Sequence, residues 1–377
     1  MQRVRESDII VGKPIKWDAY NDKGDLLLRK GCIIESESQL TALIERGLYH
    51  AEDWCQPEQG EKAGPSPSPF QILEGVQKHL SCLLHGMTTG LTKDFSLKIL
   101  NLSSMIQQAC ERDNDASIGV IFLNSTYPYT IRHPVNVAVV CETITRRMKW
   151  TDDDRAYLLA AALTANIGMI QLQDSLHLQK DPLSQEQRHQ VREHPARGVE
   201  ILLSQGVTHE TWLDAVQHHH EALDGSGYPY GLKGEAIPVA ARIIAVADHY
   251  CAGVSKRSYR QVLTPDQAMK DIYLSSGKRI DPDIVTLCVK AIGLYPPGSL
   301  VKLANNEIAV VTHRGEKAHT PFVKSIIRAN GTLFLNPAKR DCSQEEFKVQ
   351  ELLSSDQEKI AINPCQLWGY GELWGAN

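Results

Sequence analysis

Apolar residues recur at helical spacing through a long central stretch of the chain, from about residue 70 to 295. Ile72, Val76 and Leu80 fall on one face of a predicted helix. The run Leu158–Ile170 is apolar almost throughout, which predicts a central buried helix. Because strand-like alternation is weak here, the pattern predicts an all-helical domain over 70–295 and a mainly α fold for the chain.

Two further helices in this stretch have recognisable starts. Ser184 is followed three residues later by Gln187, a pairing that resembles a capping box and predicts a helix carrying His194. Another helix is predicted from Pro238 to Val254.

The pattern changes near residue 296, where short apolar runs alternate with polar loops. Asn330-Gly331 separates two of these runs and is a strong hairpin signal. The four predicted strands are 300–303, 308–311, 322–327 and 332–335. They predict a small antiparallel β appendage over 296–340. Residues 341–377 form a predicted polar tail, whose aromatic end either packs back or docks on a partner.

The first 54 residues form a predicted α/β unit of their own. Asn21–Gly24 lies between apolar runs at 14–17 and 26–28, which predicts a hairpin, and Ser36 resembles the start of a capped helix. Residues 55–69 are rich in Pro, Gly and polar side chains, which cannot bury a core, so they form a predicted linker. No cluster of reactive side chains occurs in residues 1–54, and we interpret this unit as a structural or protein-contact module.

Composition narrows the class of partner and the compartment. The net charge is −5 and no basic run occurs, so nucleic acid is not an expected partner. Nine cysteines occur without a C-x-x-C pair, and several of them lie in apolar helical runs, which predicts buried free thiols at those positions and a reducing compartment. No segment reaches about 18 uninterrupted apolar residues, the length that a membrane span needs. The sequence therefore predicts a cytoplasmic protein without a membrane span, and it leaves homo-oligomerisation open.

The most unusual stretch runs from His219 to Pro229 and reads His-His-Glu-Ala-Leu-Asp-Gly-Ser-Gly-Tyr-Pro. Imidazoles suit divalent transition metals, carboxylates suit bridging or supporting roles, and glycines let the backbone approach a ligand closely. Consecutive helical residues diverge by about 100°, so His219 and His220 meet one cluster only at a helix end or beside two metals. A polar helix end followed by a turn would explain a lone His-His pair but not the whole string.

Three other positions carry residue types that bind metals. His133 lies near a predicted helix start, and His194 precedes Pro195; each histidine alone is also compatible with a polar surface or a satisfied core position. Asp248 ends the apolar run Ile243–Ala247, where a buried carboxylate needs a cation or strong donors.

Together these segments resemble the HD-GYP domain, the variant of the HD superfamily that hydrolyses cyclic di-GMP. The resemblance covers residues 125–295. The matching segments are His133-x-x-Asn136-Val137, His194-Pro195-x-x-Gly198, His219–Pro229, Arg242–Asp248 and Arg257-Ser258-Tyr259-Arg260.

The resemblance implies an all-helical HD-type fold and a cluster of two or three metal ions, iron or manganese. At such a cluster a metal-bridging hydroxide attacks phosphorus, and the metals stabilise the attacking and leaving oxygens. The implied metal ligands are His194, His219, His220 and Asp248, with His133 as a further candidate. The implied nucleotide-binding residues are Tyr228, Pro229, Arg257 and Arg260.

The chain departs from the family at the central segment, which usually reads Leu-His-Asp-Ile-Gly-Lys. Here Ala165, Asn166 and Met169 stand where the family has His, Asp and Lys, and the intervening Ile-Gly holds the register. Alanine cannot ligate, a neutral amide is a poor bridge between two repelling cations, and methionine cannot neutralise phosphate. We therefore expect either one divalent metal, iron or manganese, or none, and His133 is the candidate ligand least expected to join it.

Two functions from different classes follow. The favoured hypothesis is a degenerate, non-catalytic HD-GYP domain in cyclic di-GMP signalling, which senses the nucleotide or docks a protein such as a diguanylate cyclase. The second is a metal-dependent cyclic di-GMP phosphodiesterase with an altered or single-metal site, because the other implied ligands are retained. Its rate would be low, since losing even one oxyanion-stabilising donor commonly costs about 10²–10³. A purely structural helical scaffold is the third alternative.

Overall fold

The computed structural model divides the chain into two compact units, residues 1–66 and 67–377. In the first unit the described residues are 2–3, 11, 19–20, 26–28, 32, 34, 36, 39–40, 49–50 and 66. In the second they are 67–89, 92–123, 126–255, 262–354 and 363–370. Predictions that concern Arg257, Arg260, residues 55–65 of the linker or residues 371–377 of the tail fall outside the described residues.

The first unit contains a small antiparallel sheet with the strand order β1-β4-β2-β3. Its strands are β1 (Gln2–Arg3), β2 (Ala19–Tyr20), β3 (Leu26–Leu28) and β4 (Tyr49–His50). β2 pairs with β3, with Ala19 opposite Leu28, so a strand does lie at 26–28, whereas the run expected at 14–17 is not among the described residues. The Ser36 hydroxyl accepts the Gln39 backbone N–H at 3.3 Å, as expected of a helix cap.

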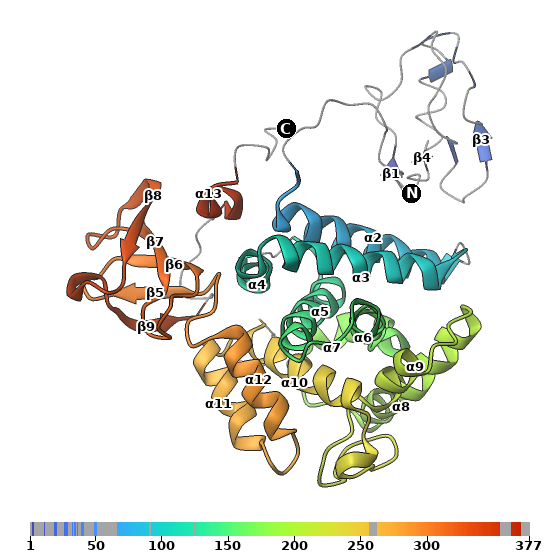
Figure 1. Cartoon of the computed structure of the whole chain (residues 1–377). Coiled ribbons are helices and arrows are strands. Elements are labelled where there is room, and N and C mark those ends of the chain that lie inside the picture. The colour runs from blue at the N-terminus through green and yellow to red at the C-terminus, as the bar shows by residue number, and fades with distance from the viewer. Residues whose placement is uncertain are drawn as a thin grey trace. The chain divides into compact units, whose positions relative to one another are not determined.

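The second unit is mainly helical, with the sheet at its C-terminal side (Figure 1). The longer helices are α2 (Pro69–Thr89), α3 (Phe95–Arg112), α4 (Asn114–Leu123), α5 (Tyr129–Arg147), α6 (Asp152–Thr164), α7 (Ile170–Leu178), α8 (Gln185–Ser204), α9 (Glu210–His218), α10 (Val239–Val254), α11 (Pro265–Ser275) and α12 (Pro282–Ile292). The short 3-10 turns are η2 (Ile167–Met169), η3 (Gly234–Ala236) and η4 (Glu345–Phe347). Helix α5 is the centre of the core, because nearly all of it is buried among α3, α6, α10 and α12.

The central apolar run is broken, contrary to the prediction of one helix over Leu158–Ile170. Helix α6 ends at Thr164, η2 follows, and α7 starts at Ile170. The physical cause is tertiary: a Cβ on Gly168 would lie 2.2 Å from the His194 carbonyl oxygen, so the backbone at this point packs directly on α8. The break places residues 165–169 beside the histidine-bearing helix.

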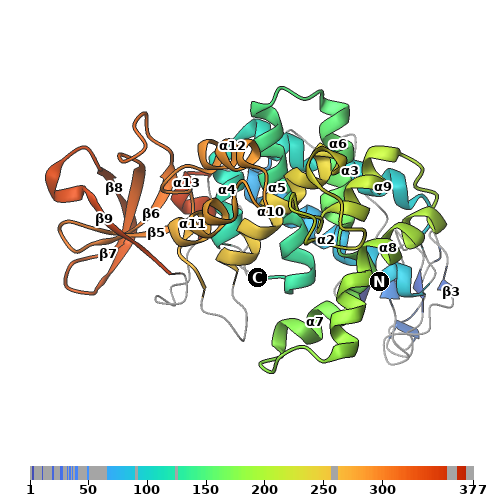
Figure 2. The ribbon, with the colours of Figure 1, turned by 90° about the horizontal axis from the view of Figure 1, so that it is seen from below.

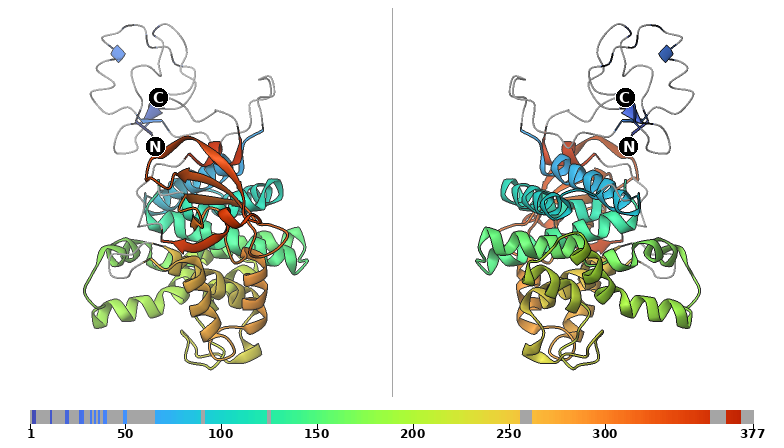
Figure 3. Two further views of the ribbon diagram at one scale, coloured as in Figure 1. Left: turned by 90° about the vertical axis from the view of Figure 1, so that its left-hand side faces the viewer. Right: turned by 90° about the vertical axis from the view of Figure 1, so that its right-hand side faces the viewer.

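Helix α8 begins with the predicted capping box. The Ser184 hydroxyl accepts the Gln187 N–H at 3.1 Å, and the Gln187 side chain accepts the Ser184 N–H at 2.9 Å. The helix expected from Pro238 to Val254 is also present as α10. Figures 2 and 3 show α7, the segment after it and the start of α8 as an arm that projects beyond the other helices.

The C-terminal sheet has five antiparallel strands in the order β8-β7-β6-β5-β9. They are β5 (Leu300–Leu303), β6 (Ile308–His313), β7 (Phe322–Ile327), β8 (Leu333–Asp341) and β9 (Val349–Leu353). β7 and β8 flank Asn330-Gly331, where Gly331 has the positive φ of 82° that the hairpin requires. The fifth strand, β9, comes from the segment expected to be a polar tail. The prediction of a mainly α fold with a small antiparallel sheet is confirmed.

The chain returns to the helical domain through α13 (Pro364–Trp368). The Trp368 ring packs edge-on against Phe70 at the start of α2, with ring centroids 5.1 Å apart. The Tyr370 hydroxyl donates to the Asp113 carboxylate at 2.9 Å. The described part of the aromatic end therefore packs back on its own chain, the first of the two outcomes expected from the sequence.

One described stretch, Asp152–Leu178, passes a test of length and apolar composition for a membrane span. Its apolar window is 61 % buried inside the protein, and the stretch runs from the buried helix α6 through η2 into α7. Burial of this kind is what the same composition gives in a core helix. The cytoplasmic location stays a prediction.

Candidate functional site

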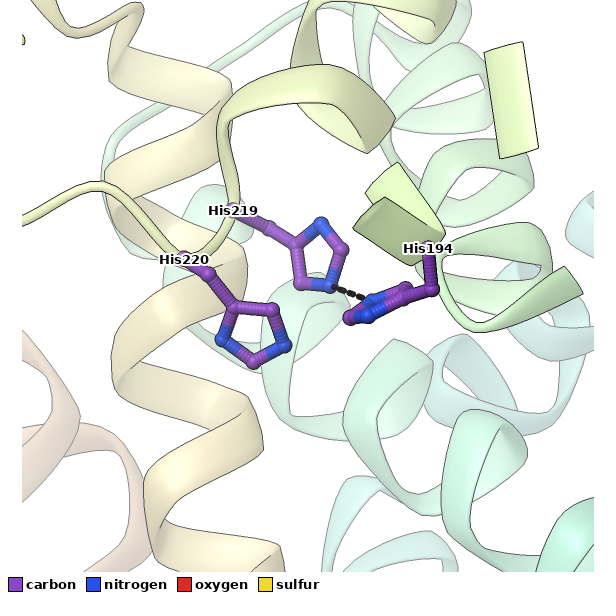
Figure 4. A group of neighbouring side chains, drawn as sticks. All are labelled: His194, His219 and His220. Atoms are coloured by element: carbon purple, nitrogen blue, oxygen red, sulfur yellow. Dashed lines mark hydrogen bonds between the residues drawn. The ribbon is translucent and has the colours of Figure 1, made fainter. Parts of the chain in front are cut away.

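His194 and His219 approach each other from α8 and from the end of α9 (Figure 4). Their Nε2 atoms lie 3.2 Å apart. On the far side of each ring, Nδ1 lies 2.6 Å from the Val191 carbonyl oxygen for His194 and 2.7 Å from that of Val216 for His219. Because a carbonyl oxygen can only accept, each Nδ1 carries the ring hydrogen and donates it.

The two Nε2 atoms of His194 and His219 therefore present lone pairs to each other. A shared proton would require a cationic ring, but burial lowers the pKa of His194 to about 3 and also lowers the pKa of His219. A divalent cation suits two such lone pairs, and donation of Nδ1–H to a carbonyl is the usual support of a metal-ligating histidine. The donor set therefore fits a metal ion.

His220 brings a third imidazole to the same place. The ligand atoms of His194, His219 and His220 all lie within 4.8 Å of one another. Helix α9 ends at His218, so the two following histidines are no longer constrained to diverge as helical neighbours do. Burial lowers the pKa of His220 well below its ordinary value, which favours the neutral, metal-binding form of the ring.

Tyr228 covers this third histidine. Its ring stacks on His220 with centroids 4.8 Å apart, and its backbone N–H donates to the His220 carbonyl at 3.1 Å. Gly227 makes the close return possible, because a Cβ there would lie 2.3 Å from the Ala222 nitrogen. The Gly-Ser-Gly-Tyr-Pro string thus folds directly back on the histidines.

Glu221 supports this loop and does not join the group of three histidines. Its carboxylate accepts the backbone N–H of Tyr230 at 2.7 Å and that of Leu232 at 3.0 Å. Two backbone donors satisfy a 6 % exposed carboxylate without a metal. Glu221 therefore positions the loop that carries Tyr228.

Asp248 on α10 pairs with His133 on α5. The His133 Nε2 lies 2.7 Å from the Asp248 Oδ1, and the His133 ring is 2 % exposed. Burial works against ionisation of the carboxyl, but the hydrogen bond and charge of His133 outweigh it, so the pKa of Asp248 lies well below its usual range. Neither side chain belongs to the group of three histidines within the described part of the chain.

Ala165, Asn166 and Met169 lie on the break between α6 and α7. Ala165 is 3 % exposed, and Asn166 lies at the start of η2. Gly168 holds this segment against α8, where a Cβ would also lie 2.8 Å from the Gly198 nitrogen. The segment thus has a tight backbone contact with the His194 helix, although its side chains offer no carboxylate, imidazole or cation.

A cavity of about 720 Å³ joins these groups. Its walls include the His133–Asp248 pair, the stacked His220 and Tyr228 rings, and Asn166 and Met169 of the substituted segment. A volume of this size suits a small-molecule ligand. The structure therefore brings four of the sequence-predicted site residues around one space, whereas His194 and His219 are buried and are not among the described wall residues.

Some site residues fall elsewhere or were not foreseen. Pro229 follows Tyr228 but is not among the described residues of the cavity wall. Tyr129, His177 and Lys180 line the cavity, although the sequence motifs did not predict them as site residues. Tyr129 could have been found, since it lies one helical turn before His133; the other two offered no motif. The roles of all these residues as ligands or nucleotide contacts stay predictions.

Comparison with known proteins agrees with this geometry. The family described as HD domain matches residues 121–284. Residues 121–284 are therefore similar to an HD domain, and HD domains as a family bind divalent metals. This matched stretch contains the histidine cluster, the His133–Asp248 pair and the substituted segment.

Curated relatives extend the match beyond the HD domain. A cyclic di-GMP phosphodiesterase of Pseudomonas aeruginosa is 28 % identical over 378 residues, which covers 92 % of this chain and 88 % of that protein. A 3'3'-cGAMP-specific phosphodiesterase of Vibrio cholerae is 31 % identical over 209 residues, which covers 54 % of this chain but only 45 % of that protein. The chain is thus similar, over most of its length, to a cyclic di-GMP phosphodiesterase.

Among solved structures, the HDG"Y"P protein of Bdellovibrio bacteriovorus has a TM-score of 0.50 and 16 % identity, with 76 % of this chain and 97 % of that chain covered. At this identity the likeness concerns the fold alone. It agrees with the mainly helical HD-type fold predicted from the sequence.

Proposed function

We propose that this chain binds cyclic di-GMP in the cavity of its HD domain without hydrolysing it, and acts in cyclic di-GMP signalling as a nucleotide sensor or protein-docking module. A diguanylate cyclase or another signalling protein is the expected kind of partner. The observation that carries the proposal is the position of Asn166 and Met169 at the cavity, with Ala165 beside them in the chain, where the resemblance expects a bridging carboxylate, a lysine and a histidine.

The first argument against turnover concerns metals. His194, His219 and His220 would hold one divalent ion, iron or manganese, which would polarise a phosphate oxygen when bound. A second ion close to the first needs an anion between them, because two divalent cations repel strongly. The neutral amide of Asn166 does not supply that anion.

The second argument concerns the proton of the attacking water. A general base must lie within hydrogen-bond reach and have a pKa near the working pH. Asp248 is the acidic side chain nearest the histidines in the described cavity wall, but His133 occupies its Oδ1 and holds its pKa well below the usual range. Such a carboxylate is a weak base, so the chain's own residues do little to activate water.

Binding of the nucleotide requires fewer chemical groups than its hydrolysis does. The aromatic rings in the cavity wall can stack on purines, and His220 with Tyr228 already forms one such stack. Sequence relatives that act on cyclic di-GMP or on 3'3'-cGAMP support a cyclic dinucleotide as the ligand class. The retained loop and cavity therefore favour a bound nucleotide over an empty scaffold.

The alternative is a slow cyclic di-GMP phosphodiesterase with a single-metal site. The facing lone pairs of His194 and His219 favour it, because they indicate that one metal position is retained. Such an enzyme would lack the two-sided stabilisation of attacking and leaving oxygens, so its rate would fall by orders of magnitude.

One set of measurements on the purified full chain separates the two. Metal content is measured by mass spectrometry, cyclic di-GMP binding by calorimetry, and hydrolysis by chromatography, with the Pseudomonas aeruginosa phosphodiesterase as the active control. We expect saturable binding without product. Turnover that disappears in His219→Ala would overturn the non-catalytic proposal and establish the alternative. Absence of both binding and turnover would reject both and leave the structural scaffold.

A further inference from the structure

One wall of the HD cavity belongs to a single continuous segment. It is formed by the end of α7 and the residues after it, and it includes Gln173, Leu176, His177, Lys180, Pro182 and Leu183. This wall lies on the projecting arm described above (Figure 2). None of these residues belongs to the motifs that the family resemblance covers, so their contribution to the cavity comes from the structure alone.

The wall presents an aromatic surface. Tyr129 stacks on two rings, His133 at a centroid distance of 4.7 Å and His177 at 4.5 Å, with interplanar angles of 17° and 14°. His177 is the half-buried member of this stack, and it lines the cavity. A second stack, His220 with Tyr228, lines the same cavity. Two aromatic stacks around one space suit a ligand with flat heterocycles.

The same wall carries a cation. Within the described cavity wall, Lys180 is the one lysine or arginine. Its side chain is exposed, and no ion pair with another described residue engages it. The cation that the resemblance expects at position 169 is absent, because Met169 stands there in the wall of the same cavity. Lys180 thus supplies the cavity with a positive charge in place of the lysine that the resemblance expects at position 169.

The backbone that carries Lys180 is anchored. The Gln179 amide nitrogen donates to the Asp181 carbonyl at 3.0 Å and to the Gln187 side-chain oxygen at 3.2 Å. The Gln187 amide nitrogen donates in return to the Gln179 side-chain oxygen at 2.8 Å. Because Gln187 also closes the capping box of α8, the segment is tied to a helix start. The cation therefore projects from a fixed backbone, which reduces the entropy cost of binding.

We infer that the α7 wall recognises the nucleotide, with His177 stacking on a purine base and Lys180 binding a phosphate in place of the cation lost at Met169. The inference rests on the proposed function, since it names the residues that hold the proposed cyclic di-GMP. It assigns recognition to a segment outside the family motifs and leaves the histidine cluster to the metal.

Calorimetric titration of the full chain with cyclic di-GMP at low and at high salt tests the phosphate contact. Lys180→Ala should weaken binding about tenfold at low salt and flatten its salt dependence, because a charge-assisted contact is lost and exposed charges are screened. Lys180→Arg should keep both the affinity and its salt dependence. The matched control is Lys290→Ala, which alters an exposed lysine on α12 that is not part of the cavity wall and should bind as the unmodified chain does.

The base contact is tested in the same way. His177→Ala should weaken binding about tenfold with an unchanged salt dependence, because stacking is not screened by ions. His177→Phe should restore the affinity for cyclic di-GMP. If the alanine variant fails to fold, the affinity of the phenylalanine variant tests the stacking contact. The control is His189→Ala, an exposed histidine on α8.

The outcomes distinguish the two proposals. If the unmodified chain binds cyclic di-GMP and the Lys180 and His177 variants bind equally well, the inference is overturned and the proposed function stands. If the unmodified chain binds no cyclic di-GMP, the proposed function fails and the inference falls with it. If the variants lose binding as stated and the controls do not, the α7 wall is the recognition surface.

Discussion

The two sides of the candidate metal site differ in the chemical groups that they carry. On one side, His194, His219 and His220 have both the side chains and the supporting carbonyl contacts of a metal site. On the other, Asn166 lies on a backbone that is still packed tightly through Gly168 against α8, but its neighbours lack metal-binding groups. The comparison shows that the packing that positions a site and the groups that perform its chemistry can be lost separately.

The largest expected effect comes from restoring the second side. Ala165→His combined with Asn166→Asp should add a second equivalent of metal and produce cyclic di-GMP hydrolysis that the unmodified chain lacks, because the bridging anion and a further ligand return. Metal analysis and product chromatography measure both. Ala165→Asn alone is the control of similar bulk. No gain in metal would mean that the space around the 3 % exposed Ala165 has closed, so that the packing has changed as well.

Removing a ligand from the first side should have the next largest effect. His219→Ala should lower affinity for Mn²⁺ about 100-fold, because it takes away one of two facing lone pairs and leaves two rings to hold the ion. Titration of chelator-treated protein measures the affinity. His189→Ala, which alters an exposed histidine of α8, should leave it unchanged. Equal affinity in both variants would show that the three histidines are not the metal site.

The backbone contact between the two sides can be broken directly. Gly168→Ala should lower the free energy of unfolding by about 1–3 kcal/mol, because the added Cβ would overlap the His194 carbonyl oxygen. Urea denaturation measures it. Gly75→Ala is the control: its Cβ would meet the Met105 Cε at 3.5 Å, an ordinary contact, and alanine favours the helix. A Gly168→Ala protein as stable as the unmodified chain would mean that the two segments part at little cost.

The smallest expected effect concerns the loop over the first side. Glu221→Gln should cost about 1 kcal/mol, because an amide NH₂ would face one of the two backbone donors that the carboxylate now accepts. Faster hydrogen exchange at Tyr230 and Leu232 would report the loosened loop. Glu235→Gln, an exposed glutamate in η3, is the comparison variant. Unchanged exchange in Glu221→Gln would show that the loop holds its shape by other contacts.

Local sequence signals predicted much of this fold. Ser184, Pro238 and Asn330-Gly331 each mark an element boundary that the structure has, because capping and turn chemistry depend on a few neighbouring residues. The break after Thr164 was not predicted, because it is caused by the close approach of Gly168 to His194 of α8, which lies 26 residues further along the chain. A long apolar run alone cannot reveal such a contact.

The site shows the same limit. Motif spacing pointed to His194, His219 and His220, and the structure brings them together. Motif spacing did not predict the contact between His133 and Asp248, which are 115 residues apart. Lys180 offered no motif at all, because its position in the cavity wall depends on the anchored segment between α7 and α8. Contacts between distant segments are set by tertiary packing, which periodicity does not encode.

The return of α13 to the start of α2 has a consequence for synthesis of the protein. Cys365 lies 3.6 Å from the Ser68 hydroxyl, a separation of 297 residues, and Trp368 packs on Phe70. The first helix of the domain therefore lacks this contact until residue 368 has left the ribosome. Closing so long a loop is slow compared with forming helices. The nascent domain is thus expected to display Phe70 until α13 has been synthesised and has packed on α2.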